Sequence, residues 1–184
     1  MPLRHKFRVV TMDSNSYAKP PGQSDLIALA YVSRRIPFAS GLSFISEMHH
    51  ILASSRHNNA LHGVTGALMA SHTSFSQILE GQRADVEAIF NKIQADKRHR
   101  EIRMLYRKRI PSRDFPHWRM AMAGASDHLS LSVEPVLSDP YGAAAKKITD
   151  RLMTVLKTLV LAQETDSPSF LRLPMRKWEN ARDA

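Results

Sequence analysis

The segment Leu26-Ile-Ala-Leu-Ala-Tyr-Val-Ser33 is the strongest indication of the fold class. It is an apolar run of strand length, too short for an independent helix. Because strand side chains alternate between two faces and both faces here are apolar, the run predicts a central strand that is covered on both sides. Tyr31 is its one member with a polar tip, and a buried tyrosine hydroxyl needs a hydrogen-bond partner.

Two amphipathic helices are expected downstream, each predicted by apolar residues at three- and four-residue spacing. The first should end near residue 56, and its apolar stripe consists of Phe44, Ile45, Met48, Ile51 and Leu52. The stripe of the second consists of Val86, Ile89, Phe90 and Ile93.

Four further strands are expected, at 64–69, 75–80, 101–110 and 115–123, with Gly81 ending the second of them. Two of these strands should each place three residues on one side: Ile102, Met104 and Tyr106, and then Trp118, Met120 and Met122. The order of elements predicts an α+β fold, a ferredoxin-like βαββαββ sheet with two helices on one face and a C-terminal helical extension.

Three parts are expected along the chain. Residues 1–24 form a flexible basic N-terminal arm with a Pro-Pro-Gly break, and 25–123 form the domain. Residues 124–184 form the helical extension and a tail, with a long helix at about 143–163 that could cover the second face of the sheet.

Composition excludes several kinds of site. The 184 residues include no cysteine, so disulfides, thiolate metal sites and cysteine nucleophiles are excluded. No apolar run reaches the ~18 residues of a membrane span, and a soluble, cytoplasmic protein is expected. The nine histidines show no His-Glu-x-x-His pattern, and nucleotide-binding glycine motifs and the GxSxG motif are absent.

Gln77 is the residue that most suggests a ligand. It lies in the middle of a predicted strand, on the face that the helices should cover, where a primary amide must be hydrogen-bonded. Tyr31 carries the same demand from the first strand. The two could satisfy each other in the core, or Gln77 could bridge the phenol and a heteroaromatic ligand, because an amide both donates and accepts.

Six segments in this order resemble the BLUF family, blue-light sensors that use FAD. They are Leu29-Ala-Tyr-Val-Ser33, Ser55-Arg-His-Asn-Asn59, Gly63-Val-Thr-Gly66, Phe75-Ser-Gln-Ile-Leu-Glu-Gly81, Asp96-Lys-Arg-His99 and Phe115-x-x-Trp118-x-Met120. The resemblance runs from about residue 25 to residue 123. Each segment is weak alone, but six at the right spacing are specific.

The resemblance implies FAD as cofactor, with FMN or riboflavin as substitutes, held between the two helices. The residues implied to contact it are Asn58, Asn59, Ile51, Ile93, Lys92, Asp96, Arg98 and His99. The photoactive residues implied are Tyr31, Gln77, Trp118 and Met120. Lys92 stands where the family commonly has arginine, so the planar bidentate fork is lost while the charge is kept.

The resemblance also implies a photochemical function without enzymatic activity. Tyr31 gives an electron to the excited flavin, a proton moves through Gln77, and the glutamine is left rotated or tautomerised. The flavin absorption then shifts to the red and recovers in the dark.

The expected output is light-dependent contact with a downstream protein, which would be acidic or a transcription regulator. The sensor itself is expected to be a homo-oligomer. The net charge of +9 makes direct contact with nucleic acid a further partner class. The alternative function is a basic nucleic-acid-binding module without a chromophore. That module needs exposed aromatic residues in a signature that this chain lacks.

Overall fold

The computed structural model describes residues 25–37, 43–122, 133–139 and 142–165. The predicted basic arm at 1–24 and the tail after 165 lie outside these residues, as do residues 123–132.

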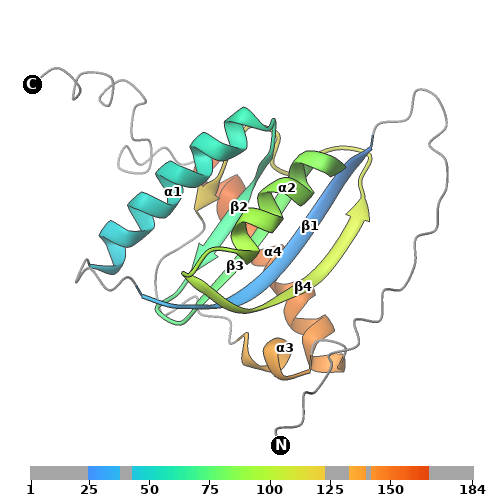
Figure 1. The fold of residues 1–184 in the computed structure, drawn as a ribbon. Coiled ribbons are helices and arrows are strands. Elements are labelled where there is room, and N and C mark those ends of the chain that lie inside the picture. Colours follow the sequence, from blue (N-terminus) through green and yellow to red (C-terminus); the bar gives the residue numbers. More distant parts are fainter. Residues whose placement is uncertain (1–24, 38–42, 123–132, 140–141, 166–184) are drawn as a thin grey trace, which may run out of the picture.

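One five-stranded sheet forms the centre of the molecule (Figure 1). Its strands are β1 (Leu26–Arg35), β2 (Thr65–Ala70), β3 (Ser74–Gln82), β4 (His99–Arg109) and β5 (Ala121–Met122), in the order β4-β1-β3-β2-β5. The β2–β5 pair is parallel and the other pairs are antiparallel. The central position predicted for β1 and the ferredoxin-like α+β fold are confirmed.

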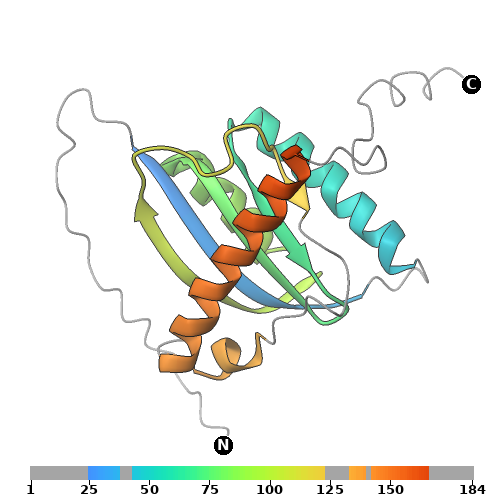
Figure 2. The ribbon, with the colours of Figure 1, turned by 180° about the vertical axis from the view of Figure 1, so that it is seen from behind.

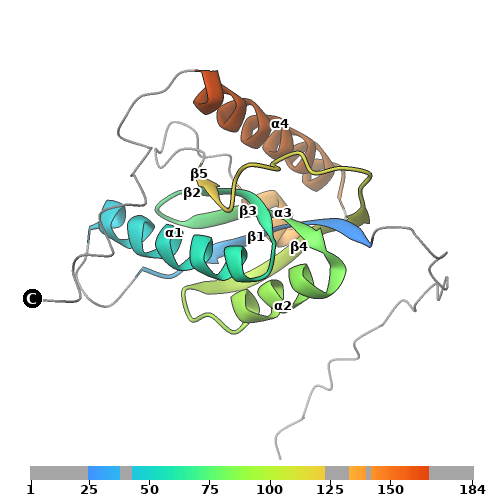
Figure 3. The ribbon, with the colours of Figure 1, turned by 90° about the horizontal axis from the view of Figure 1, so that it is seen from above.

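Helices cover both faces of this sheet. α1 (Phe44–Leu61) and α2 (Arg83–Gln94) lie on one face, and α4 (Ala143–Thr165) crosses the other, preceded by the short α3 (Glu134–Ser138) (Figures 2 and 3). Leu152 and Leu156 of α4 are fully buried against the sheet. Both faces of β1 are therefore shielded from water, which its two apolar faces require.

A buried ion pair fixes the start of α1. Arg35, at the end of β1, pairs with Glu47 in the first turn of α1, and both side chains are almost fully buried. The Arg35 guanidinium also donates to the backbone carbonyl of His72 at 2.9 Å, in the turn between β2 and β3. Since a buried charge is tolerated only when it is paired and hydrogen-bonded, these contacts hold three segments in one arrangement.

The prediction that α1 ends near residue 56 is wrong, because the helix continues to Leu61. The two asparagines that suggested an end lie within the helix, and both side chains find hydrogen-bond acceptors. Asn58 donates to the Ser54 carbonyl at 3.0 Å, and Asn59 is buried and donates across to another segment. The turn comes at Gly63, whose φ of 60° is the left-handed conformation that glycine adopts without strain.

The prediction that Gly81 ends β3 is wrong, because the strand continues to Gln82 and pairs with the beginning of β1. A Cβ at Gly81 would come within 3.2 Å of the side chains of Val64 and Val86. The glycine thus permits close packing of α2 against the sheet.

The last strand is much shorter than the predicted 115–123, and only Ala121–Met122 pair with β2. The preceding residues form turns that side chains hold in place. Trp118 and Met120 were predicted on one side, but Trp118 packs in the cluster on the α4 side, whereas Met120 is buried on the α1–α2 side.

β4 departs from simple alternation as well. Its pairing with β1 shifts register between Ala30 and Tyr31, where Leu105 is the extra residue. This bulge turns Leu105 and Tyr106 toward the α4 side, while Ile102 packs on the α1–α2 side. The prediction that Ile102, Met104 and Tyr106 share a face is therefore wrong.

Candidate functional site

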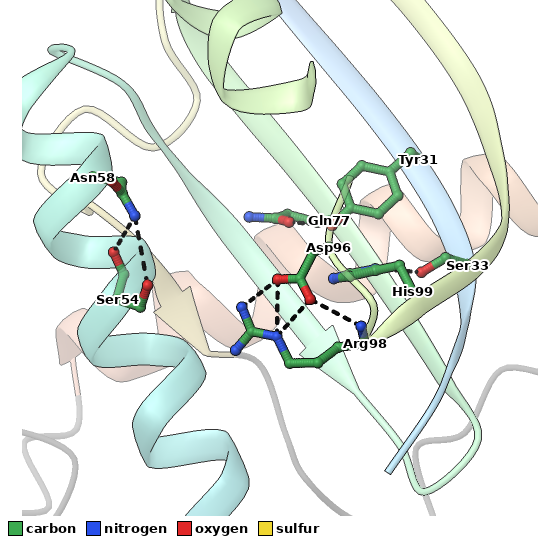
Figure 4. Close-up of polar contacts among 8 residues, drawn as sticks. All are labelled: Tyr31, Ser33, Ser54, Asn58, Gln77, Asp96, Arg98 and His99. Atoms are coloured by element: carbon green, nitrogen blue, oxygen red, sulfur yellow. Dashed lines mark hydrogen bonds and ion pairs between the residues drawn. The ribbon is translucent and has the colours of Figure 1, made fainter. Parts of the chain in front are cut away.

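Tyr31 and Gln77 lie directly opposite each other on the antiparallel neighbours β1 and β3. Opposite residues of such a pair point to the same face, so both side chains enter the core beneath α1 and α2. The Tyr31 hydroxyl donates to Gln77 Oε1 at 2.5 Å, and both residues are buried (Figure 4). The predicted tyrosine–glutamine pair is present.

The other end of the Gln77 amide points to a methionine. Gln77 Nε2 lies 3.4 Å from Met120 Sδ, and a thioether is a weak acceptor that cannot donate. The orientation of the amide is thus defined on both sides, with the carbonyl toward the phenol and the NH₂ toward the sulfur. Of the two residues predicted near the end of the sheet, Met120 rather than Trp118 contacts this network.

The phenol of Tyr31 is held in its protonated form. Burial raises its pKa well above the usual value of a tyrosine, and the carboxylate of Asp96 adds to this shift. The ring centroids of Phe90 and His99 lie 5.5 and 6.0 Å from the centroid of the Tyr31 ring. An unionised phenol whose one strong hydrogen bond goes to an amide carbonyl can release its proton only along that bond.

His99 contributes a neutral imidazole beside this pair. Its Nδ1 lies 2.8 Å from Ser33 Oγ, and the centroid of its ring lies 4.6 Å from that of the Phe75 ring. Burial lowers the pKa of His99 to about 4, although the Asp96 carboxylate acts in the opposite direction. The imidazole therefore carries no charge at neutral pH.

Asp96 and Arg98 form an ion pair at the start of β4. Burial acts to raise the pKa of Asp96, but hydrogen bonds from the Arg98 side chain and backbone outweigh it and lower the pKa. Figure 4 shows this pair on the same side of the sheet as Gln77 and His99. The site thus contains one fixed carboxylate next to a cation.

α1 supplies two side chains that hold the segment leading into β5. Asn59 Nδ2 donates to the Arg119 carbonyl at 2.5 Å, and Arg56 Nε donates to the Met120 carbonyl at 3.1 Å. Asn58, by contrast, bonds to Ser54 within its own helix (Figure 4). Asn59 is the member of this pair that reaches the core.

The remaining predicted residues flank the pair from the two helices. Ile51 of α1 and Ile93 of α2 pack in the same apolar cluster as Tyr31. Lys92 is exposed, and its ammonium lies 3.5 Å from His62 Nε2. It stands at the rim of this region and makes no described contact with the phenol–amide pair.

Sequence reasoning missed two residues that build this site. Arg56 was assigned no role from the sequence, and its hydrogen bond to the Met120 carbonyl spans 64 positions of the chain. Glu80 is buried on β3, and its carboxylate accepts the backbone N–H groups of Asp114 and Phe115 at 3.0 and 2.9 Å. The sequence did contain a signal for Glu80. Alternation places it on the same buried face as Ile78, and a buried carboxylate must accept hydrogen bonds from donors nearby.

These residues fit a flavin. A buried amide has only a thioether opposite its donor end, so a stronger acceptor would be favoured there. Aliphatic side chains from two helices suit the faces of a flat ring, and Lys92 and Arg98 supply positive charge for phosphates. Within the described residues, no group of three or more His, Asp or Glu side chains could hold a metal ion.

Comparison with known proteins agrees with this geometry. Residues 26–121 match the family model described as "Sensors of blue-light using FAD". The chain belongs to the BLUF family. FAD is the chromophore of this family, so the predicted fold, cofactor and blue-light sensing are confirmed together.

Two solved BLUF proteins resemble the chain over nearly their whole length. BlrB in its dark state is 26% identical with a TM-score of 0.58, and the match covers 73% of this chain and 97% of BlrB. BlsA in its photo-activated state is 25% identical with a TM-score of 0.56, over 74% of this chain and 95% of BlsA.

A curated relative is far longer. The photoactivated adenylate cyclase subunit alpha of Euglena gracilis is 28% identical over 139 residues, which are 76% of this chain but 13% of the relative. The match thus spans a small fraction of that protein. In the part of the chain that the structure describes, no helix has the length and apolar character needed to cross a membrane.

Proposed function

We propose that Tyr31 and Gln77 are the photoactive pair of this BLUF sensor and that Met120 is the first residue to respond. The observation that carries the proposal is the continuous contact from the phenol through the amide to the sulfur, at 2.5 and 3.4 Å. When bound, FAD supplies absorption of blue light and an acceptor for an electron. The protein supplies a buried donor and a rotatable amide.

The proposed contact set for FAD comes from both helices and from the start of β4. Ile51 and Ile93 would flank the ring, Asn59 and the Gln77 amide would bond its polar edge, and Lys92, Asp96, Arg98 and His99 would hold its side chain and phosphates. Asn59 is a better candidate than Asn58, because it is buried while Asn58 bonds within α1.

Rotation of the Gln77 amide gives the pair two distinct states. In the present state its carbonyl accepts from Tyr31 and its NH₂ points to Met120. A half-turn would place the carbonyl opposite the sulfur, which has no proton to donate. The contact with Met120 would be lost, and the segment that Arg56 and Asn59 also hold would lose one of its anchoring contacts. Such a local event biases a two-state element elsewhere.

The output is proposed to be binding of a partner protein rather than catalysis. We propose residues 25–123 as the flavin-binding domain and 124–184 as an extension, with oligomers as the working state. The near-complete coverage of BlrB and BlsA supports this reading, because the match takes in almost all of those two BLUF proteins.

The test is the absorption spectrum of the FAD-loaded protein before and after blue light. Tyr31→Phe and Gln77→Leu should each keep bound FAD and lose the red shift. The matched control is Tyr106→Phe, since the Tyr106 hydroxyl bonds to Met153 on the opposite side of the sheet. An intact red shift in Gln77→Leu would refute the assignment.

A further inference from the structure

β4 is an edge strand of the sheet. This eleven-residue strand pairs with β1 on one side, and within the described residues no strand pairs with its other side (Figure 1). An edge of this kind presents backbone N–H and C=O groups that can extend the sheet with a further strand.

The side chains along this edge are strongly basic. Five cations lie within β4 against a single acid, Glu101. The cations, all exposed, are Arg100, Arg103, Arg107, Lys108 and Arg109. A strand so charged repels a second copy of itself, which disfavours self-association through this edge.

Neighbouring carboxylates neutralise only part of this charge. Glu87 binds Arg107 at 2.8 Å, Asp25 lies 3.6 Å from Arg109, and Glu101 is taken by Arg34 at 2.7 Å. Arg103 and Lys108 have no carboxylate within ion-pair distance among the described residues. Among the described residues, positive charge therefore exceeds negative charge along this edge.

The chemistry of β4 favours a peptide over a single-stranded nucleic acid. Single-stranded nucleic acids bind by stacking on exposed aromatic side chains. Tyr106 is the one aromatic residue of Tyr, Phe or Trp type on β4. The Lys108 ammonium lies over the Tyr106 ring, 4.9 Å from its centroid, and the Tyr106 hydroxyl donates to Met153 Sδ. No platform for bases is left on this strand.

We propose that the outer edge of β4 binds an acidic, extended segment of a partner protein by strand addition. Backbone hydrogen bonds would supply affinity, and alternate acidic side chains would meet Arg103 and its basic neighbours. Met104 of β4 lies opposite Tyr31 in the register of β1, so the docked segment would lie one strand from the photoactive residue. Only a light dependence of binding rests on the proposed function.

The experiment titrates the FAD-loaded full chain into a fluorescent peptide of about nine residues that alternates Glu with Val or Thr. Arg103→Glu combined with Lys108→Glu should weaken binding by about tenfold or more, because two attractive contacts become repulsive. The matched control is Lys146→Glu combined with Lys147→Glu, which makes the same change of charge at two exposed positions of α4. This control should bind like the unmodified protein.

Three further measurements separate the outcomes. Amide hydrogen exchange in β4 should slow when the peptide binds, and a peptide with Lys in place of Glu should not bind. Equal affinity of the β4 and α4 variants would overturn the proposal, as would tighter, equally variant-sensitive binding of duplex DNA. A concentration-dependent dimer abolished by the β4 variant would overturn it in favour of a second copy. Absence of peptide binding with an intact red shift would refute this inference and leave the proposed function standing.

Discussion

Acidification should destabilise the protein through His99. The imidazole is packed against the rings of Phe75 and Tyr31 and bonded to Ser33, and burial lowers its pKa from 6.5 to about 4. Below pH 6.5 His99 binds a proton in the unfolded chain but stays unprotonated in the folded protein until the pH approaches 4. Stability from this group is therefore complete above pH 6.5 and is lost as the pH falls from 6.5 toward 4.

The size of the effect follows from the two pKa values. A shift from 6.5 to about 4 in one group is worth about 3 kcal/mol over the whole range. Between about pH 7.5 and about pH 5, linkage gives a loss of about 2 kcal/mol in the free energy of unfolding.

The assay is urea unfolding at these two pH values for the unmodified protein and for His99→Gln, without FAD because His99 belongs to its proposed contact set. Glutamine can keep a hydrogen bond to Ser33 but cannot titrate. The difference in unfolding free energy between the two proteins should change by about 2 kcal/mol between the two pH values. An unchanged difference would show that His99 is not buried in neutral form, and the reasoning would fail.

Two further substitutions test how the segment before β5 is held. Glu80→Ala removes the acceptor of two backbone N–H groups, the buried one of Phe115 and the partly buried one of Asp114, so the free energy of unfolding should fall by about 2–4 kcal/mol, whereas the partly exposed Glu87→Ala should change it by about 0.5 kcal/mol or less. Equal losses in urea unfolding would contradict this. Arg56→Ala removes a charged hydrogen bond to the Met120 carbonyl and destabilises the resting contact with Gln77, so dark recovery of the red shift should slow by about tenfold. Arg56→Lys should recover part of the rate, and recovery as fast as in the unmodified protein for Arg56→Ala would remove Arg56 from the mechanism.

Local sequence patterns were enough to predict the central strands and the tyrosine–glutamine pair on them. The apolar run around Tyr31 and the amide at Gln77 both follow strand periodicity, which is a local property. Alternation places each side chain on one face, and antiparallel pairing then brings them into contact. The stripes that carry Ile51 and Ile93 are equally local, because they depend only on helical periodicity.

The identity of the residue that contacts the Gln77 amide, in contrast, depends on the folded chain. Regular alternation put Trp118 and Met120 on one side, but the chain before β5 is not a strand. Its path is set by Glu80, Asn59 and Arg56, which lie 34 to 64 positions away in the sequence. Hydrogen bonds from such distant side chains leave no periodic trace in the segment that they hold, so its conformation exists only once the sheet and α1 have come together.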